Sequence, residues 1–225
     1  MLKFTPAASS TLCPPLLLLT LGLSACAGSS SGHSQGPDNG AAEPQPTASC
    51  DGSGTDLCDQ WLNAHNQVRR QLNAGPLTNS PKPDDGIADL QWDSRLAQVA
   101  QSYADQCQYA HNGQRGDQYQ ALGGDASVGE NIAAYYSSQP PAQQVYSPAQ
   151  FTALWQSEME DFVYEPLGTT VSYQDVGHYT QLIWRSTTHV GCAIAQCQTG
   201  GSTPYMTYAV CDYSPSGNYL NQYPY

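Results

Sequence analysis

Basic residues are scarce in this sequence. Lysine and arginine together number 7 against 19 aspartates and glutamates, which gives a formal net charge of -12 at pH 7. A surface this acidic repels phosphate backbones and anionic lipid headgroups, so nucleic acid is not expected as a partner. Basic ligands and metal cations suit such a surface better.

Long apolar runs are also missing. The run centred on Leu16–Leu19 follows Lys3 and is too short to span a bilayer, so residues 1–25 are predicted to form a signal peptide. Leu23-Ser24-Ala25-Cys26 resembles a bacterial lipobox, which implies cleavage before Cys26, lipidation of its sulfur and a membrane anchor. The alternative is an ordinary signal peptide that leaves Cys26 as a free thiol. In the lipobox interpretation six cysteines remain, an even number.

Residues 26–49 contain no large aliphatic and no aromatic side chain, and Gly, Ser, Pro and Gln are frequent there. Such a segment cannot offset the entropy of ordering, so a disordered tether is predicted, with His33 a solvated part of it. Residues 50–225 are predicted to form one domain in an extracytoplasmic, oxidising compartment.

Apolar spacing and capping residues predict three helices, which begin at Asp56, Asp93 and Ser147. The first ends near Asn73, and its His65 is expected at the helix surface or the core edge. The side chains expected to face inward are Leu57, Trp61, Val68 and Leu72 in the first helix, Leu96, Val99, Ala100, Tyr103 and Cys107 in the second, and Phe151, Trp155, Glu158 and Phe162 in the third.

Glu158 stands where this third pattern requires an apolar residue. A carboxylate that faces a core costs several kcal/mol unless it is paired or hydrogen-bonded. We therefore expect a cation, a metal or a good hydrogen-bond donor opposite Glu158.

The last third of the chain alternates with a period of two, which predicts strands over 178–184, 190–196 and 205–213. A turn at Gly200-Gly201 makes the last two a hairpin with Cys192 opposite Cys211. Cys107–Cys197 and Cys50–Cys58 are then the expected further pairs among fifteen possible connectivities. Helices followed by strands predict an α+β sandwich in which helices cover an antiparallel sheet.

Several segments resemble signatures of the CAP family (cysteine-rich secretory, antigen 5, pathogenesis-related 1). They are LNAHNQVRR, LQWDSRLAQVAQSYADQC, GENIA, GHYTQLIWRSTTHVGCAIAQC and CDYSPSGNYLNQYPY, in order from about Cys58 to Tyr225. The resemblance implies an α-β-α sandwich. Val176 and Asp212 depart from the pattern of plant members, which often carry cysteine and asparagine there, and both departures are expected to lie away from the central cleft.

In many CAP domains two histidines and two acids line that cleft. The resemblance places His111 (in YAHNG), Glu130 (in GENIA), Glu158 and His178 (in GHYTQ) in these roles, with Asn131 and Gln181 as supporting hydrogen-bonders. His111, His178 and Glu130 would be ligands for zinc or another divalent metal. The alternative is a hydrogen-bonded acid–histidine network that does no chemistry.

The remaining polar residues have simpler interpretations. His189, in a Ser/Thr-rich turn, is expected to face solvent. Tyr135, Tyr136, Tyr179 and Tyr208 could line a binding groove or pack within strands.

Three functions are compatible with these features. The resemblance to members that bind sterols or fatty acids favours a non-enzymatic module with a small lipophilic ligand between helices and a cation in the cleft. The second is a zinc-dependent peptidase or esterase with Glu130 or Glu158 as base, although no His-Glu-x-x-His motif is present. The third is a secreted, defence-like protein that acts on a host or competitor, since residues 215–225 resemble a signalling peptide released in plants.

Overall fold

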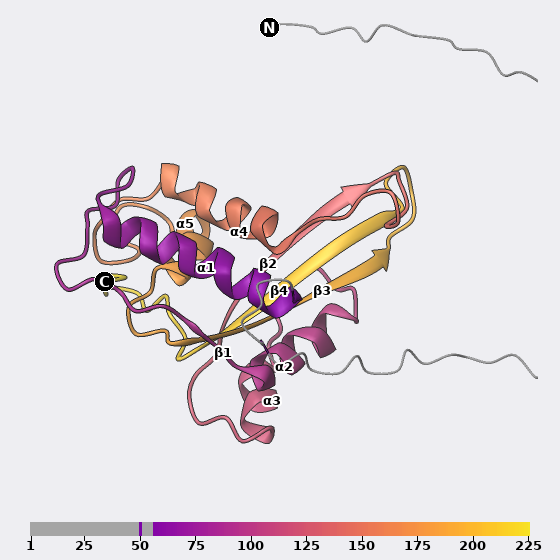
Figure 1. The fold of residues 1–225 in the computed structure, drawn as a ribbon, viewed down its shortest axis with the longest axis horizontal. Coiled ribbons are helices and arrows are strands. Elements are labelled where there is room, and N and C mark those ends of the chain that lie inside the picture. The colour runs from indigo at the N-terminus through magenta and orange to yellow at the C-terminus, as the bar shows by residue number, and fades with distance from the viewer. Residues whose placement is uncertain (1–49, 51–55) are drawn as a thin grey trace, which may run out of the picture. The chain divides into compact units, whose positions relative to one another are not determined.

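The computed structural model describes Cys50 and residues 56–225 (Figure 1). The predicted signal peptide, the lipidation site at Cys26 and the tether lie outside the described residues. None of the helices between residues 56 and 225 is long and apolar enough to cross a bilayer.

A four-stranded sheet forms the centre of the domain, with strand order β1-β3-β4-β2. β3 and β4 form the predicted hairpin, and Cys192 pairs with Cys211 in its register. Gly200 and Gly201 both have positive φ in the turn, a conformation that glycine adopts without strain. β2 pairs antiparallel with β4 and is an edge strand. The strands are β1 (Gln91–Trp92), β2 (Gly129–Ser137), β3 (His189–Gln198) and β4 (Tyr205–Ser214).

Three helices begin where the sequence predicts. Asp56 and Asp93 are the N-caps of α1 and α2, and the Ser147 side chain accepts from the Gln150 amide in a capping box at the start of α4. The helices are α1 (Leu57–Ala74), α2 (Ser94–Ala104), α3 (Arg115–Ala121), α4 (Pro148–Ser157), the 3-10 turn η1 (Glu158–Glu160) and α5 (Tyr173–Leu182).

Helices cover both faces of the sheet (Figure 1). Alternate residues of β4 point in opposite directions, so Cys211 and Tyr213 join the core under α1, α4 and α5, while Tyr208 and Val210 pack against α2. α2 lies so close to β3 that a Cβ on Gly191 would be 2.1 Å from the backbone nitrogen of Ala97. The predicted α+β sandwich is confirmed.

All three predicted disulfides are present. Cys50–Cys58 closes a short loop at the start of α1, Cys107–Cys197 ties the end of the α2 segment to β3, and Cys192–Cys211 joins the hairpin strands. The pairing of all six cysteines in the described chain leaves none of them as a nucleophile.

The predicted strand over 178–184 is wrong, because these residues belong largely to α5. The burial of Val176, Tyr179, Thr180 and Leu182 follows helical spacing, and the Ser172 side chain caps the helix by accepting from the Gln174 amide. A short stretch in which every second residue is bulky is compatible with a strand and with a helix, and here the N-cap at Ser172 favours the helix.

Two inward positions are also wrong. Leu57 is 46% exposed because it lies in the first turn of α1, outside the contact with the sheet. Cys107 is not helical: α2 ends at Ala104, and Cys107 takes a positive φ that turns it toward Cys197. Helix α3 and strands β1 and β2 were not predicted.

The C-terminal segment is tied to the body of the domain by backbone hydrogen bonds. The Leu167 amide donates to the Gln222 carbonyl, and the Arg185 amide donates to the Pro224 carbonyl. The Tyr225 hydroxyl donates to the Pro81 carbonyl. In the folded protein residues 215–225 are therefore part of the domain.

Candidate functional site

His111 and Glu130 form one acid–histidine pair. Nδ1 of His111 lies 2.7 Å from Oε1 of Glu130, and the same oxygen accepts from the backbone amide of Asn112 at 2.9 Å. The Glu130 side chain is fully buried, whereas the His111 side chain is 54% exposed. The Glu130 carboxylate thus binds Nδ1 of His111, and the exposed part of the His111 ring is accessible to a ligand.

His178 and Glu158 form a second pair. Nδ1 of His178 lies 2.5 Å from Oε1 of Glu158, and Oε2 accepts from the backbone amides of His178 and Tyr179. α4 ends at Ser157, and the 3-10 turn that follows carries Glu158 toward α5. The acid that interrupts the apolar pattern of this helix is therefore paired and hydrogen-bonded.

The contacts of the two carboxylates set the tautomer of both histidines. An ionised carboxylate only accepts, so Nδ1 of His111 and of His178 must carry the proton that is donated. In a neutral imidazole Nε2 then carries the free lone pair. Both rings are therefore oriented and prepared as Nε2 ligands.

Strand β2, at the edge of the sheet, connects the two pairs. Glu130 shares its side of the strand with Ile132, which packs against α2, whereas Asn131 points to the other side and donates to the His178 carbonyl at 3.1 Å. Asn131 therefore links the second pair to the strand that carries the first.

The predicted metal ligands His111, His178 and Glu130 do not meet as a set of three. Within Cys50 and residues 56–225, three ligand atoms come within 4.8 Å of one another only in two other groups. Each group contains a disulfide, whose sulfurs are not thiolates and therefore do not serve as metal ligands. Oε1 of Glu130 already accepts from His111 and Asn112, so this acid supports His111 instead of joining the two histidines as a ligand. The groups are His65, Cys192 and Cys211, and Cys50, Cys58 and Asp59.

Gln181, predicted to support the site, bonds elsewhere. Its amide nitrogen donates to the Thr187 hydroxyl, and its amide oxygen accepts from the Gly217 backbone. It therefore fixes the start of the C-terminal segment, and neither of these bonds reaches an acid–histidine pair.

Asp212 was expected away from the cleft, and that prediction is wrong. It lies directly opposite Glu130 in the β2–β4 register and is fully buried. Among Cys50 and residues 56–225, no group forms a hydrogen bond with either of its carboxylate oxygens or with Oε2 of Glu130. Burial raises the pKa of Asp212 well above its usual range, the charge of Glu130 raises it further, and Arg115 opposes the rise. A sequence pattern cannot show this contact, because it depends on strand register.

The expected groove tyrosines divide into core and surface. Tyr179 and Tyr208 are fully buried and pack in the core, Tyr135 stacks on Tyr146, and Tyr136 is 49% exposed. His189 is half-buried at the start of β3, where its Nδ1 lies 2.8 Å from the Thr188 hydroxyl.

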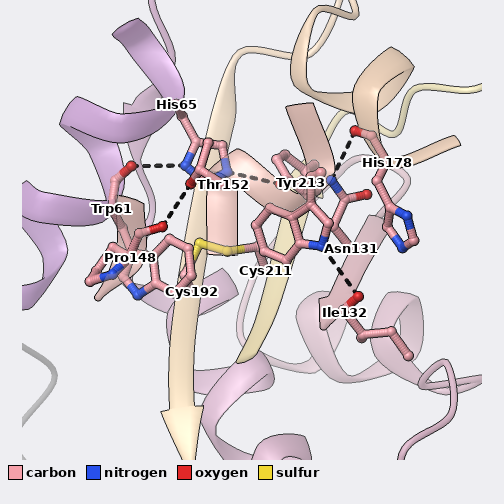
Figure 2. Close-up of a disulfide and its surroundings, with 11 residues drawn as sticks. Trp61, His65, Asn131, Ile132, Pro148, Thr152, His178, Cys192, Cys211 and Tyr213 are labelled. Carbon is pink, nitrogen blue, oxygen red and sulfur yellow. Dashed lines mark hydrogen bonds between the residues drawn. A yellow bond between two sulfur atoms is a disulfide. The ribbon is translucent and has the colours of Figure 1, made fainter. Parts of the chain in front are cut away.

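His65 was expected at a helix surface or core edge, but it is completely buried. Nδ1 lies 2.8 Å from the Trp61 carbonyl, and Nε2 lies 2.8 Å from the Tyr213 hydroxyl (Figure 2). Residues from β4 and α4 pack against the His65 ring, and the residue spacing in α1 alone does not predict these contacts.

The burial of His65 predicts a loss of stability in acid. Burial lowers the pKa of His65 to about 4, with the bond to Trp61 opposing and the charge of Arg69 adding to the effect. Below its unfolded pKa of about 6.5 the unfolded chain binds a proton that the folded chain refuses, so about 3 kcal/mol is lost as the pH falls from 7 to 4. The difference in unfolding free energy between the wild type and His65→Gln, measured by urea unfolding, should show this pH dependence, whereas the difference between the wild type and His189→Gln should not.

This fold and pair of sites define a disulfide-bonded α-β-α domain with two oriented histidines. The model of the family described as "Cysteine-rich secretory protein family" matches residues 62–213, and the chain belongs to this family, the CAP family. Membership and the three disulfides indicate an extracytoplasmic location. The lipid anchor stays a prediction.

Relatives from insects and plants support the assignment. Venom allergen 5 of Polistes fuscatus is 35% identical over 176 residues, which cover 73% of this chain and 76% of the relative. Pathogenesis-related protein 1 of Arabidopsis thaliana is 33% identical over 175 residues, which cover 76% and 83%.

Solved structures share the fold. A crystal structure of NaASP2 with Zn2+ matches with a TM-score of 0.61 at 24% identity and covers 79% of this chain and 90% of that one. The structure of BmVAL-1 matches with a TM-score of 0.58 at 27% identity, with 75% and 81% covered.

Proposed function

We propose that this protein is an extracytoplasmic, non-enzymatic CAP module whose site binds a divalent metal such as zinc through Nε2 of His111 and His178. One observation carries the proposal: each histidine places Nδ1 against a glutamate. A carboxylate on the far nitrogen fixes the ring and raises its basicity, an arrangement typical of zinc-binding histidines. Here Glu130 and Glu158 would be these supporting carboxylates.

Two further features favour a metal ligand. The net charge of -12 raises the local concentration of cations. A protein of the same fold, NaASP2, has been solved with Zn2+. Bound zinc would supply positive charge and a Lewis-acid centre, with two imidazoles from this chain and water in the other positions.

The hydrogen bonds that Glu130 and Glu158 already accept favour metal binding over hydrolysis. A general base must reach a metal-bound water with a free carboxylate oxygen. Both oxygens of Glu158 accept hydrogen bonds from α5, and Oε1 of Glu130 accepts from two donors while Oε2 is buried beside Asp212. Both oxygens of Glu158 are engaged and Glu130 is buried, so metal binding is better supported than hydrolysis.

The lipophilic ligand and the defence-like role stay predictions. Between α1 and α4, Trp61 stacks on Trp155 with ring centroids 5.8 Å apart, and Phe151 packs against Trp61 at 6.1 Å. These three side chains are buried and fill the space between the two helices. A lipid placed there would have to displace them, which makes the metal the better supported ligand.

Zinc titration of the metal-free chain tests the proposal. We expect one zinc per chain by calorimetry and elemental analysis. His111→Ala and His178→Ala should each weaken binding by about 100-fold, because each removes a ligand, and Glu158→Gln by about 10-fold, because it removes only the support of one.

His189→Ala is the matched control, since it deletes a histidine outside both pairs and should bind like the wild type. Circular dichroism and unfolding midpoints must show that all variants are folded. A double variant, His111→Ala with His178→Ala, that still binds one zinc with wild-type affinity would overturn the proposal.

A further inference from the structure

A line of buried polar groups begins at His65 in α1 (Figure 2). The Trp61 carbonyl can only accept, so Nδ1 of His65 carries the proton that it receives at 2.8 Å. Nε2 of the neutral ring is then an acceptor, and the Tyr213 hydroxyl, 2.8 Å away, must donate to it. The direction of both bonds is therefore fixed.

Tyr213 connects His65 to strand β2. Burial raises the pKa of Tyr213 well above its usual range, while the charge of Arg69 and a hydrogen bond from Asn131 lower it. Asn131 lies opposite Cys211 in the β2–β4 register and Tyr213 follows two residues later, so both side chains project from the same face of the sheet. The phenol thus donates to His65 and lies beside the Asn131 side chain (Figure 2). Tyr213 and His65 are fully buried and Asn131 nearly so, so water cannot replace a lost partner.

Asn131 completes the connection to the candidate site. Its amide nitrogen donates to the His178 carbonyl at 3.1 Å (Figure 2). The His178 ring in turn contacts Glu158. The line therefore crosses from α1 through β4 and β2 to α5. Trp155 packs beside both ends, with its ring 6.1 Å from that of His65 and 6.4 Å from that of His178.

We propose that His65 is a positioning residue for the metal site, which acts through Tyr213 and Asn131 to fix the backbone and ring of His178. The proposal rests on the metal-binding function for its effect on affinity. The expected effect on the geometry of His178 does not depend on metal binding, since the hydrogen bonds are present in the chain without a metal. His65 itself contacts neither of the two ligands.

Tyr213→Phe tests the line, because it removes the hydroxyl and keeps the ring. Tyr179→Phe is the matched control: Tyr179 is equally buried, lies in α5 next to His178, and its hydroxyl bonds only outward to Ser80 at 2.8 Å. We expect zinc affinity to fall about 10-fold in Tyr213→Phe and to stay within about twofold in Tyr179→Phe. Equal losses in both variants would show a general loosening of α5 and overturn the proposal.

A double-mutant cycle adds a readout that a merely structural role would not move. If His65 acts only through Tyr213, the zinc affinity of His65→Gln combined with Tyr213→Phe should match that of Tyr213→Phe alone. Fully additive losses in binding free energy would contradict the line.

Nitrogen-15 spectra of the metal-free protein separate this inference from the proposed function. The His178 ring resonances should shift in His65→Gln and Tyr213→Phe and stay in place in Tyr179→Phe. Unchanged His178 resonances in the first two variants overturn the positioning role even if zinc binds. If the wild type binds no zinc but the His178 resonances shift as expected, the proposed metal-binding function is wrong and the positioning of His178 by His65 is supported.

Discussion

Arg69→Met should lower the free energy of unfolding by about 4 kcal/mol or more, enough to unfold many domains of this size. Arg69 is fully buried in α1, and the described structure gives it no carboxylate within ion-pair distance. Backbone carbonyls surround its guanidinium instead. They belong to Ala88, Leu182, Trp184 and Thr187.

The size of this effect follows from what the substitution leaves behind. Methionine fills a similar volume but donates nothing, and each buried carbonyl without a donor costs about 1–3 kcal/mol. Two of the four carbonyls lie at the C-terminal end of α5, where the helix dipole also favours a cation. Burial lowers the pKa of Arg69 to about 10, against the influence of Tyr213 and Asp89, so the group is charged at pH 7.

The next residue supplies the control. Arg70 is exposed and pairs at the surface with Asp89, so Arg70→Met should leave the free energy of unfolding almost unchanged. Arg69→Lys should be intermediate, since an ammonium has fewer donors and no planar fork. Urea unfolding followed by circular dichroism measures all three variants. A loss below 1 kcal/mol for Arg69→Met would mean that water or a shifted backbone satisfies the four carbonyls.

The hairpin and disulfides show what this sequence reveals without coordinates. The Gly200-Gly201 turn fixes the register of β3 and β4, and that register alone places Cys192 opposite Cys211. N-caps at Asp93 and Ser147 are equally local signals and mark the correct helix starts. Features set by neighbouring residues were therefore predictable.

Features set by distant residues were not. The strand predicted over 178–184 is part of α5, whose period is ambiguous over so few residues, and the burial of His65 depends on β4 and α4. The four residues implied by the family resemblance do come together as two pairs, but their connection through β2 depends on the sheet order. Strands β1 and β2 lie at the sheet edges; β1 has only two residues, and the first five residues of β2 are all buried, so neither shows an alternating pattern.

The environment of Asp212 also depends on distant residues, and its substitution is the second change expected to have a large effect on stability. In sequence it is an acid beside a cysteine, and in the fold it is a fully buried carboxyl opposite the Glu130 carboxylate. Three oxygens of the two acids have no hydrogen-bond partner. Two desolvated carboxylates in contact repel, so the folded state strongly favours a proton on the pair.

Asp212→Asn should therefore stabilise the protein increasingly as the pH rises. The pKa of Asp212 is raised in the folded state by burial and by Glu130. Below the unfolded pKa of about 4 both states hold the proton and the residue causes no pH-dependent loss. Above it the folded chain binds the extra proton, so stability falls by about 1.4 kcal/mol per pH unit until the raised pKa is passed.

The asparagine variant has no proton to lose, and its amide can donate to Oε2 of Glu130. The gap between the two proteins should thus grow steadily as the pH rises above about 4. The acid loss caused by His65 is common to both proteins and cancels in the comparison. Asp105→Asn, which removes an exposed acid at the end of α2, controls for net charge.

Urea unfolding at pH 4.5, 6 and 7.5 measures the gap directly. A constant gap across this range would mean that Asp212 is already ionised when folded, and that a bound cation or ordered water compensates the two charges. In that case the variant would also weaken binding of the compensating ion, which elemental analysis detects. A gap that widens with pH, with no ion lost, instead establishes a protonated pair behind His111, in which the proton keeps the Glu130 charge available to the histidine.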